Sequence, residues 1–449
     1  MISSATAEEQ SPGTETVSRP LDWRKPMRNA GKLTLGRSVQ AVCSLAYLAF
    51  ATRTIGLDGF GKLVLIHSLS LAVTQMARFE SWQTIVRFGA PAWRGGDPVR
   101  LRQVLNFGLL LDLAGMVFGA LAYAAVLYPL GAWMGLSADA RNFALPYGLA
   151  VIVMLNISGS ATGLLHLLDR FGSLAKASTL EPVIRLIGAT ALFFLGGGLK
   201  AFLILWLIAL SASHVATVLA AFTHLTRCGA PWKFRFEKDA WTHSEPGMWR
   251  YAFGTFWVGT MNVARDYLPT LAAGVVAGAA GAGLLKIAKQ FSDVLTGITT
   301  KLLVPALFSE FAHLKEGEQR ALLARLNLLA VALFLLVFLC LAGFGKNLIL
   351  LIAGPEFVTA YPAMLWFAFA GVLGATSFGF ETLLAAIGAI RQVVWANSIS
   401  LVLYFAAMAA LLRPMGIAGV GMAAVAQAAV RSTLLWWNAR SRGHPGRRE

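Results

Sequence analysis

Charged residues are scarce in this chain of 449 residues: only 13% are Asp, Glu, Lys or Arg, whereas 57% are hydrophobic and the mean hydropathy is +0.64. A soluble domain carries about 25% charged residues, because its surface must face water. The composition therefore excludes a soluble enzyme, a disordered chain and a collagen-like fibre. It predicts an all-α polytopic membrane protein.

Cysteine is also rare, and the common motifs of enzyme sites are missing. The three cysteines, Cys43, Cys228 and Cys340, lie far apart and form no metal-binding pair. The sequence contains no GxxxxGK[ST], HExxH, CxxC or GxSxG motif. We therefore expect no catalytic residue, no metal and no cofactor. Without a nucleotide site, transport would draw on an ion gradient, a substrate gradient or a partner.

Long apolar stretches are abundant instead, and twelve of them have the length of a membrane-spanning helix, about 20 residues. They cover approximately 33–52, 62–84, 104–126, 145–166, 179–197, 200–224, 251–274, 284–307, 322–344, 362–386, 392–412 and 418–437. An even number of crossings places both termini on one side of the membrane.

The distribution of Lys and Arg predicts which side that is. Of the 38 basic residues, 24 fall in the segments on the side of the termini, six fall on the other side, and the rest lie within helices. Because basic residues accumulate on the cytoplasmic side, both termini are expected there, in the inner membrane of a bacterium. The same distribution explains most of the net charge of +16, so no nucleic-acid partner is expected.

The longest internal connection divides the chain into two halves. We expect a disordered cytoplasmic tail at 1–32, two six-helix lobes at 33–224 and 251–437, an interfacial linker at 225–250, and a basic cytoplasmic tail at 438–449. The sequence Gly-x-x-Gly-x-Gly occurs at 56–61 and again, 222 residues later, at 278–283. This repetition favours a transporter built from two related lobes around a central cavity, although glycine also suits tight turns at membrane boundaries.

Charges within the apolar stretches are the candidates for function, because each costs at least about 2.5–3.5 kcal/mol at bilayer depth. One group lies within about two turns of a cytoplasmic helix end, where long side chains can reach the interface: Arg37, Arg78, Glu80, Glu181, Arg185, Lys301, Glu381 and Arg431. The second group is deeper: Asp112, Arg265, Asp266, Lys286, Lys289 and Asp293.

The deeper group predicts a cationic cavity. Lys286, Lys289 and Asp293 share one face of a helix at spacings of three and four residues. Lys289 and Asp293 could neutralise each other as a structural pair. Basic groups nevertheless outnumber acids on the two helices that carry the deeper charges, which favours a water-filled cavity for an anionic substrate.

Four segments resemble the polysaccharide transporter family of the MOP flippase superfamily, which flips lipid-linked O-antigen and exopolysaccharide units. They are ATRTIGLDGFGKL (51–63), AGAGLLKIAKQFSDVLTGITTKLLVPALFSEFA (280–312), LLIAGPEFVTAYPAMLWFAFAG (350–371) and PMGIAGVGMAAV (414–425). Their order and spacing extend the resemblance from about Leu33 to Ala439.

The resemblance implies a twelve-helix transporter that moves an undecaprenyl-pyrophosphate-linked oligosaccharide repeat unit between membrane leaflets by alternating access. Basic residues that could bind this anionic lipid-linked substrate, matched by helix and depth, are Arg37, Arg78, Arg265, Lys286 and Lys289. Asp112, Asp266 and Asp293 are candidates for coupling to H⁺ or Na⁺, and the polysaccharide polymerase machinery is a possible partner.

Three other interpretations compete with this one. A purely structural membrane protein would not be expected to keep this many buried charges. A multidrug or other exporter of the same superfamily would favour an acidic or apolar cavity for cationic drugs. An integral-membrane glycan polymerase or ligase would place its catalytic residues in a large outer loop, and the longest outer connections predicted here, 127–144 and 345–362, are short.

The predicted topology can be measured with reporter fusions. Fusions after Lys238 and Glu449 should report a cytoplasmic location, and a fusion after Leu136 should report a periplasmic one, because the basic segments remain inside. A periplasmic signal at Lys238 would contradict both the orientation and the division into lobes.

Overall fold

The computed structural model describes the backbone of residues 24–228, 245–311, 316–377, 379–381, 384 and 389–442. Within these ranges, the side chains before residue 40 and at 294–326 are among those not described. The predicted tail up to residue 23, the linker segment 229–244 and the last seven residues lie outside the described part of the chain. Every regular element in the described ranges is a helix.

The elements follow one another with short connections. In chain order they are α1 (Arg24–Ala77), α2 (Ser81–Arg94), α3 (Pro98–Trp133), α4 (Ala138–Ile157), α5 (Gly159–Leu167), α6 (Phe171–Leu195), α7 (Leu199–Arg227), α9 (Met248–Phe311), α10 (Glu316–Ile352), the 3₁₀ helix η1 (Pro355–Ala360), α11 (Tyr361–Ala375), α13 (Ile390–Met415) and α14 (Ile417–Arg442).

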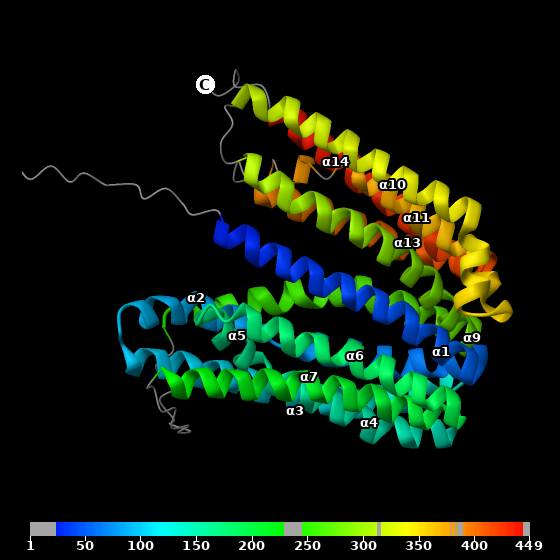
Figure 1. Cartoon of the computed structure of the whole chain (residues 1–449), viewed down its shortest axis with the longest axis horizontal. Coiled ribbons are helices and arrows are strands. Elements are labelled where there is room, and N and C mark those ends of the chain that lie inside the picture. Colours follow the sequence, from blue (N-terminus) through cyan, green and yellow to red (C-terminus); the bar gives the residue numbers. More distant parts are fainter. Residues whose placement is uncertain are drawn as a thin grey trace, which may run out of the picture.

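Ten segments of the described chain are long and apolar enough to cross a membrane. Two of them are long enough for two crossings: Val42–Arg94 has 53 residues and Met248–Asp293 has 46, more than twice the length of one crossing, about 20 residues. Each contains a sharp turn, after which the chain runs back through the bundle (Figure 1). Counted as two crossings each, they give twelve, and the predicted twelve-helix fold is confirmed.

Both sharp turns are made by glycine in the same backbone conformation. Gly56 has φ 64° and ψ −175°, and Gly278 has φ 68° and ψ −170°. Residues with a side chain very rarely adopt these angles, so each turn requires glycine. The first glycine of the repeated Gly-x-x-Gly-x-Gly sequence therefore has the same structural role in both halves.

The helices form two lobes, which meet where α1 of one contacts α9 of the other (Figure 1). The N-lobe comprises α1–α7, and the C-lobe comprises α9–α14. The beginning of α1 and the end of α14 lie at one end of the molecule, as an even number of crossings requires. The ribbons of the two lobes diverge toward that end and converge at the opposite end, where α1 and α9 turn.

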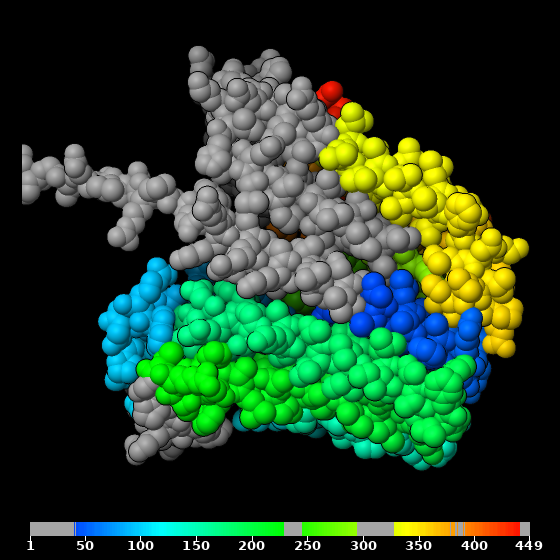
Figure 2. All heavy atoms as spheres, in the orientation of Figure 1, coloured from blue at the N-terminus to red at the C-terminus, as the bar shows by residue number. Residues whose placement is uncertain are grey.

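The outer face of the bundle is apolar. In Figure 2, side chains of α6 and α7 cover much of the N-lobe surface that faces the viewer. This pair of helices exposes large apolar side chains, including Phe194, Ile208, Leu219 and Phe222. A surface of this kind is stable against lipid rather than water, which agrees with a multi-pass membrane protein.

At the converging end the backbones of the two lobes nearly touch. A Cβ atom on Gly61 would lie 2.0 Å from the carbonyl oxygen of Ala279, and one on Gly283 would lie 3.2 Å from Cα of Gly61. The third glycine of each repeated sequence, Gly61 in α1 and Gly283 in α9, thus allows the two helices to cross at short distance.

Polar and aromatic contacts reinforce this crossing. The Arg53 guanidinium donates a hydrogen bond to the carbonyl oxygen of Leu351, and the Leu57 amide donates to the Glu356 carboxylate at 2.9 Å. The rings of Phe60 and Phe357 meet edge to face, 5.8 Å between centroids. We call these contacts, together with the glycine crossing, the end gate; they close the lobes against each other.

Gly61→Ala is expected to destabilise the protein by about 1–3 kcal/mol, because the new methyl group overlaps a backbone oxygen that cannot move alone. Thermal unfolding of the purified protein in detergent measures this change. Gly343→Ala is the matched control, because its Cβ would meet no atom within 4 Å. Equal unfolding midpoints for the two variants would contradict the close crossing.

Candidate functional site

A cavity of about 420 Å³ lies inside the N-lobe and is bordered on one side by α9. Its wall combines aromatic, polar and charged side chains from α1, α4, α6, α7, α9 and the segment after α1: Tyr47, Val64, His67, Ser68, Leu71, Gln75, Arg78, Leu155, Glu181, Arg185, Trp206, Leu210, His214, Tyr267 and Lys286. Three of these are basic and one is acidic, so the wall has an excess of positive charge. We call this space the N-lobe cavity.

Arg78 and Lys286 bring two of the predicted substrate-binding residues into this cavity. Arg78 follows the end of α1, and its Nε atom is buried without a hydrogen-bond partner. Lys286 is on α9, eight residues after the turn at Gly278, and has no ion pair among the described side chains. Both cations are therefore available to an anion in the cavity.

Arg185 is a third cation in the wall, and the sequence did not predict its position. It lies midway along α6, not near a helix end, because α6 begins at Phe171 rather than at about residue 179. Its guanidinium is 2.6 Å from the Glu181 carboxylate and 4.6 Å from the ring centre of Trp206. The side chain is only 12% exposed, so Arg185 is a buried charge rather than an interfacial one.

The cavity histidines are held by interhelical hydrogen bonds. His67 Nδ1 and the Tyr147 hydroxyl are 2.6 Å apart, and His214 Nδ1 and the Ser158 hydroxyl are also 2.6 Å apart. The Trp206 ring meets His67 edge to face, with 4.5 Å between ring centroids. These contacts fix the aromatic side of the cavity.

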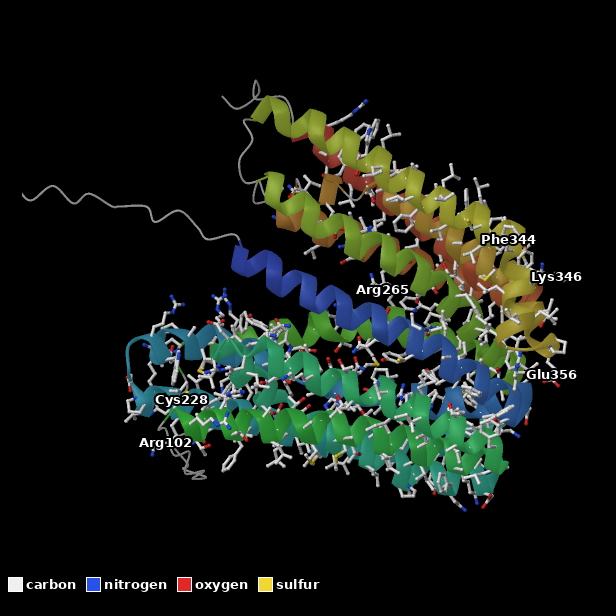
Figure 3. All side chains as sticks on the ribbon, viewed as in Figure 1. Arg102, Cys228, Arg265, Phe344, Lys346 and Glu356 are labelled. Atoms are coloured by element: carbon white, nitrogen blue, oxygen red, sulfur yellow. The ribbon has the colours of Figure 1, made fainter. Side chains whose placement is uncertain are left out.

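A second cluster of charges lies on α9. It contains Arg265 and Lys289, which the sequence also predicted to bind substrate. Asp266 is 3.8 Å from both Arg265 Nε and Lys289 Nζ. Arg265 and Asp266 are each about half exposed, and Figure 3 places Arg265 between the ribbons of the two lobes. The neighbour of Lys289 at Asp266 was not predicted, because the two residues are separated by 23 positions and meet only across the turn of α9.

The two clusters adjoin along α9. Asp266 precedes Tyr267 of the cavity wall, and Lys289 lies about one helical turn after Lys286. The Tyr267 hydroxyl accepts a hydrogen bond from Gln75 of α1, which joins the two lobes at this depth. Four of the predicted basic residues therefore belong to one continuous region.

Asp112 lies elsewhere, in the packed interior of the N-lobe. Its carboxylate accepts hydrogen bonds from the Ser81 hydroxyl at 2.6 Å and from the Ser160 amide and hydroxyl at 2.8 and 2.6 Å. Ser160 is in the first turn of α5, directly after the break between α4 and α5. Asp112 thus supplies acceptors for an interrupted helix.

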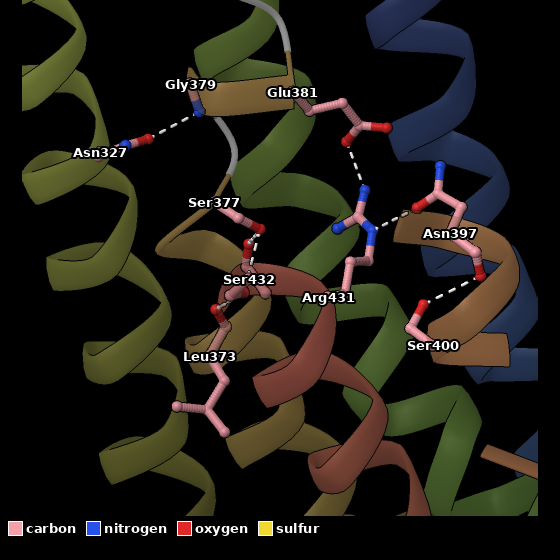
Figure 4. A network of polar contacts seen from close by, with 10 residues as sticks. Asn327, Leu373, Ser377, Gly379, Glu381, Asn397, Ser400, Arg431 and Ser432 are labelled. Carbon is pink, nitrogen blue, oxygen red and sulfur yellow. Dashed lines mark hydrogen bonds and ion pairs between the residues drawn. The ribbon is translucent and has the colours of Figure 1, made fainter. Parts of the chain in front are cut away.

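In the C-lobe, too, a polar side chain binds the backbone where a helix ends (Figure 4). The Asn327 side chain of α10 accepts a hydrogen bond of 2.7 Å from the Gly379 amide, just beyond the end of α11. Nearby, Arg431 of α14 donates to the Glu381 carboxylate and to the Asn397 side-chain oxygen. Arg431 and Glu381 therefore form an internal ion pair.

Other charges singled out from the sequence are less informative about the site. Arg37 and Lys301 lie where no side chains are described. Asp293 is exposed, lies one turn beyond Lys289 on α9 and has interactions of its own. Ion coupling and substrate binding by the predicted residues remain predictions.

Comparisons with known proteins agree with this architecture. No protein-family model matches the chain. The chain is 27% identical over 341 residues to "Inner membrane protein YghQ" of Escherichia coli (strain K12). The aligned region covers 76% of this chain and 95% of YghQ.

Two solved structures show the fold. Lipid II flippase MurJ in an inward closed conformation superimposes with a TM-score of 0.73 and 12% identity, over 91% of this chain and 87% of MurJ. An inward-facing multidrug resistance MATE family transporter of the MOP superfamily gives a TM-score of 0.69 and 13% identity, over 90% of this chain and 94% of that chain. The chain therefore has the two-lobe, twelve-helix fold of these transporters.

Asp112→Ala is expected to lower stability, because the buried Ser160 amide loses its acceptor, a loss worth about 1–3 kcal/mol. Thermal unfolding and the yield of folded protein measure the effect. Asp139→Ala is the control, since Asp139 is 80% exposed and its ion pair with Lys200 contributes little. Normal stability of Asp112→Ala combined with abolished transport would instead indicate an ion-coupling role.

Proposed function

We propose that this protein is a flippase that moves an undecaprenyl-pyrophosphate-linked oligosaccharide repeat unit from the cytoplasmic to the periplasmic leaflet of a bacterial inner membrane, for O-antigen or exopolysaccharide synthesis. The observation that carries the proposal is the N-lobe cavity, where Arg78, Arg185 and Lys286 face a single carboxylate, Glu181. That carboxylate already neighbours Arg185, so Arg78 and Lys286 provide the unbalanced charge.

Such a cavity suits a pyrophosphate headgroup. A phosphate anion does not cross hydrocarbon unaided, and Arg and Lys donors replace its hydration shell with charge-assisted hydrogen bonds. Tyr47, Trp206 and Tyr267 in the same wall offer ring faces and hydroxyl groups to a sugar. The lipid chain would remain in the bilayer while the headgroup moves through the protein.

The end gate supports alternating access. The lobes are closed against each other at the end opposite the termini. With cytoplasmic termini, as the Lys and Arg distribution predicts, the closed end is periplasmic and this conformation receives substrate from the cytoplasmic side. Opening of the gate would release the headgroup to the other leaflet.

Coupling to H⁺ or Na⁺ would involve Asp266 or Asp293, which are at the surface of α9, rather than Asp112, whose oxygens already accept three hydrogen bonds.

Multidrug export is the competing function, since a MATE transporter shares the fold. The basic excess of the N-lobe cavity disfavours cationic drugs and favours the flippase.

Lys286→Ala is expected to reduce surface polysaccharide by at least tenfold at normal protein levels, with lipid-linked repeat units accumulating in the cells, because a cation that binds the headgroup is lost. Lys286→Arg should retain partial activity, since the charge remains while the geometry changes. Surface polysaccharide staining and extraction of the lipid-linked intermediates measure both.

Lys200→Ala is the matched control, because Lys200 lies at the start of α7 outside the cavity and is 57% exposed. Its surface polysaccharide should equal that of the unmodified protein. Normal polysaccharide in Lys286→Ala and in a deletion strain, together with new sensitivity to cationic drugs, would assign the protein to multidrug export.

A further inference from the structure

A separate pocket of about 760 Å³ lies between α2 and the beginning of α9, at the end of the molecule where the chain termini lie. Helix α2 contributes Trp82, Arg87 and Phe88, and α9 contributes Arg250 and Tyr251. We call this pocket the α2–α9 groove. None of its residues was predicted to bind substrate.

In the groove, two arginines have no carboxylate partner among the described residues. Arg87 and Arg250 are both exposed, and neither forms an ion pair with an acid in the described part of the chain. The acid that lines the groove, Glu80, accepts a hydrogen bond of 2.6 Å from the Trp82 indole. The Arg87 guanidinium lies over the Tyr251 ring, 4.7 Å from its centre, which fixes its position.

This combination fits a phosphate group. Guanidinium groups bind phosphate through paired, charge-assisted hydrogen bonds, and a stacked arginine loses little freedom when it does so. Trp and Tyr beside the arginines are typical of side chains at the depth of lipid headgroups.

The groove also borders the hydrocarbon. Val258 lines it and is 59% exposed, and Phe253 and Trp257 on the same part of α9 are 55% and 61% exposed. In a membrane these side chains contact lipid tails. A phosphate that carries a lipid chain could therefore occupy the groove with its tail outside, whereas a soluble phosphate would gain nothing from this border.

The groove leads toward the N-lobe cavity. Glu80 of the groove is two residues from Arg78 of the cavity. On α9, Asn262 of the groove and Tyr267 of the cavity are five residues apart, about 7.5 Å along a helix. The groove and the cavity are therefore lined by neighbouring parts of the same two segments, with arginines in the groove and Arg78, Arg185 and Lys286 in the cavity.

We propose that the α2–α9 groove is the lateral access site of the transporter, where Arg87 and Arg250 bind the phosphate of the lipid-linked substrate before it moves into the N-lobe cavity. This inference rests on the proposed function and adds a route from the bilayer. The α2–α9 side of the molecule is then where substrate enters.

The double variant Arg87→Ala with Arg250→Ala tests the proposal in full-length protein reconstituted in nanodiscs. Undecaprenyl pyrophosphate is the probe, and quenching of tryptophan fluorescence by binding is the measurement. We expect its affinity to fall by about tenfold or more, the effect of losing one or two charged hydrogen bonds. The control is Arg94→Ala with Arg102→Ala, which removes two basic residues near the same end outside the groove and should bind normally.

Binding of inorganic pyrophosphate distinguishes a site for a lipid-linked phosphate from a site for a soluble anion. Weak binding of pyrophosphate, with no dependence on Arg87 and Arg250, supports a lipid site. Pyrophosphate that binds as tightly as the lipid, and loses affinity in the double variant, would assign the groove to a soluble anion and overturn the proposal.

Lys286→Ala distinguishes failure of this inference from failure of the proposed function. If Lys286→Ala weakens lipid binding and the double variant does not, the flippase function stands and the access site is wrong. If the unmodified protein does not bind undecaprenyl pyrophosphate at all, both are wrong.

Discussion

The crossing of α1 and α9 is the contact on which the arrangement of the two lobes depends. At Gly61 the two backbones approach so closely that a single methyl group would overlap Ala279. The turns at Gly56 and Gly278 bring the chain back immediately beside this point, so the same short sequence both reverses the helices and lets them touch. Because α9 also borders the N-lobe cavity, the crossing fixes Lys286 and Tyr267 relative to the residues of the N-lobe.

The chain uses its intramembrane charges in two ways. Arg431 with Glu381, and Asp112 with its serines, are satisfied by neighbouring helices and hold broken or adjacent helices in place. Arg78 and Lys286 lack such partners among the described side chains and face a cavity. Since a charge without a partner is costly in a membrane, the lack of a partner is a better indicator of function than charge alone.

Much of the fold followed from the sequence, because the length of an apolar stretch and the distribution of Lys and Arg are local properties. The twelve helices and the repeated glycine turns are examples. The site was only partly predictable: Lys286 and Arg78 were identified from charge and depth, whereas the position of Arg185 depended on where α6 begins. The neighbour of Lys289 at Asp266 and the α2–α9 groove arise from helices that meet only after folding, and no spacing along the chain contains that information.

The hydrogen bonds of the end gate make a modest contribution to the stability of the closed conformation. The hydrogen bonds of Arg53 and Leu57 each include one charged group, and a hydrogen bond of this kind contributes about 1.5–3 kcal/mol. Each lobe, in contrast, is braced internally where its helices break, by Asp112 on one side and Asn327 on the other. Opening of the gate therefore requires water to replace these hydrogen bonds and also requires the close glycine crossing and the buried contact of Phe60 with Phe357 to separate, whereas each lobe can move as a unit without breaking its internal hydrogen bonds.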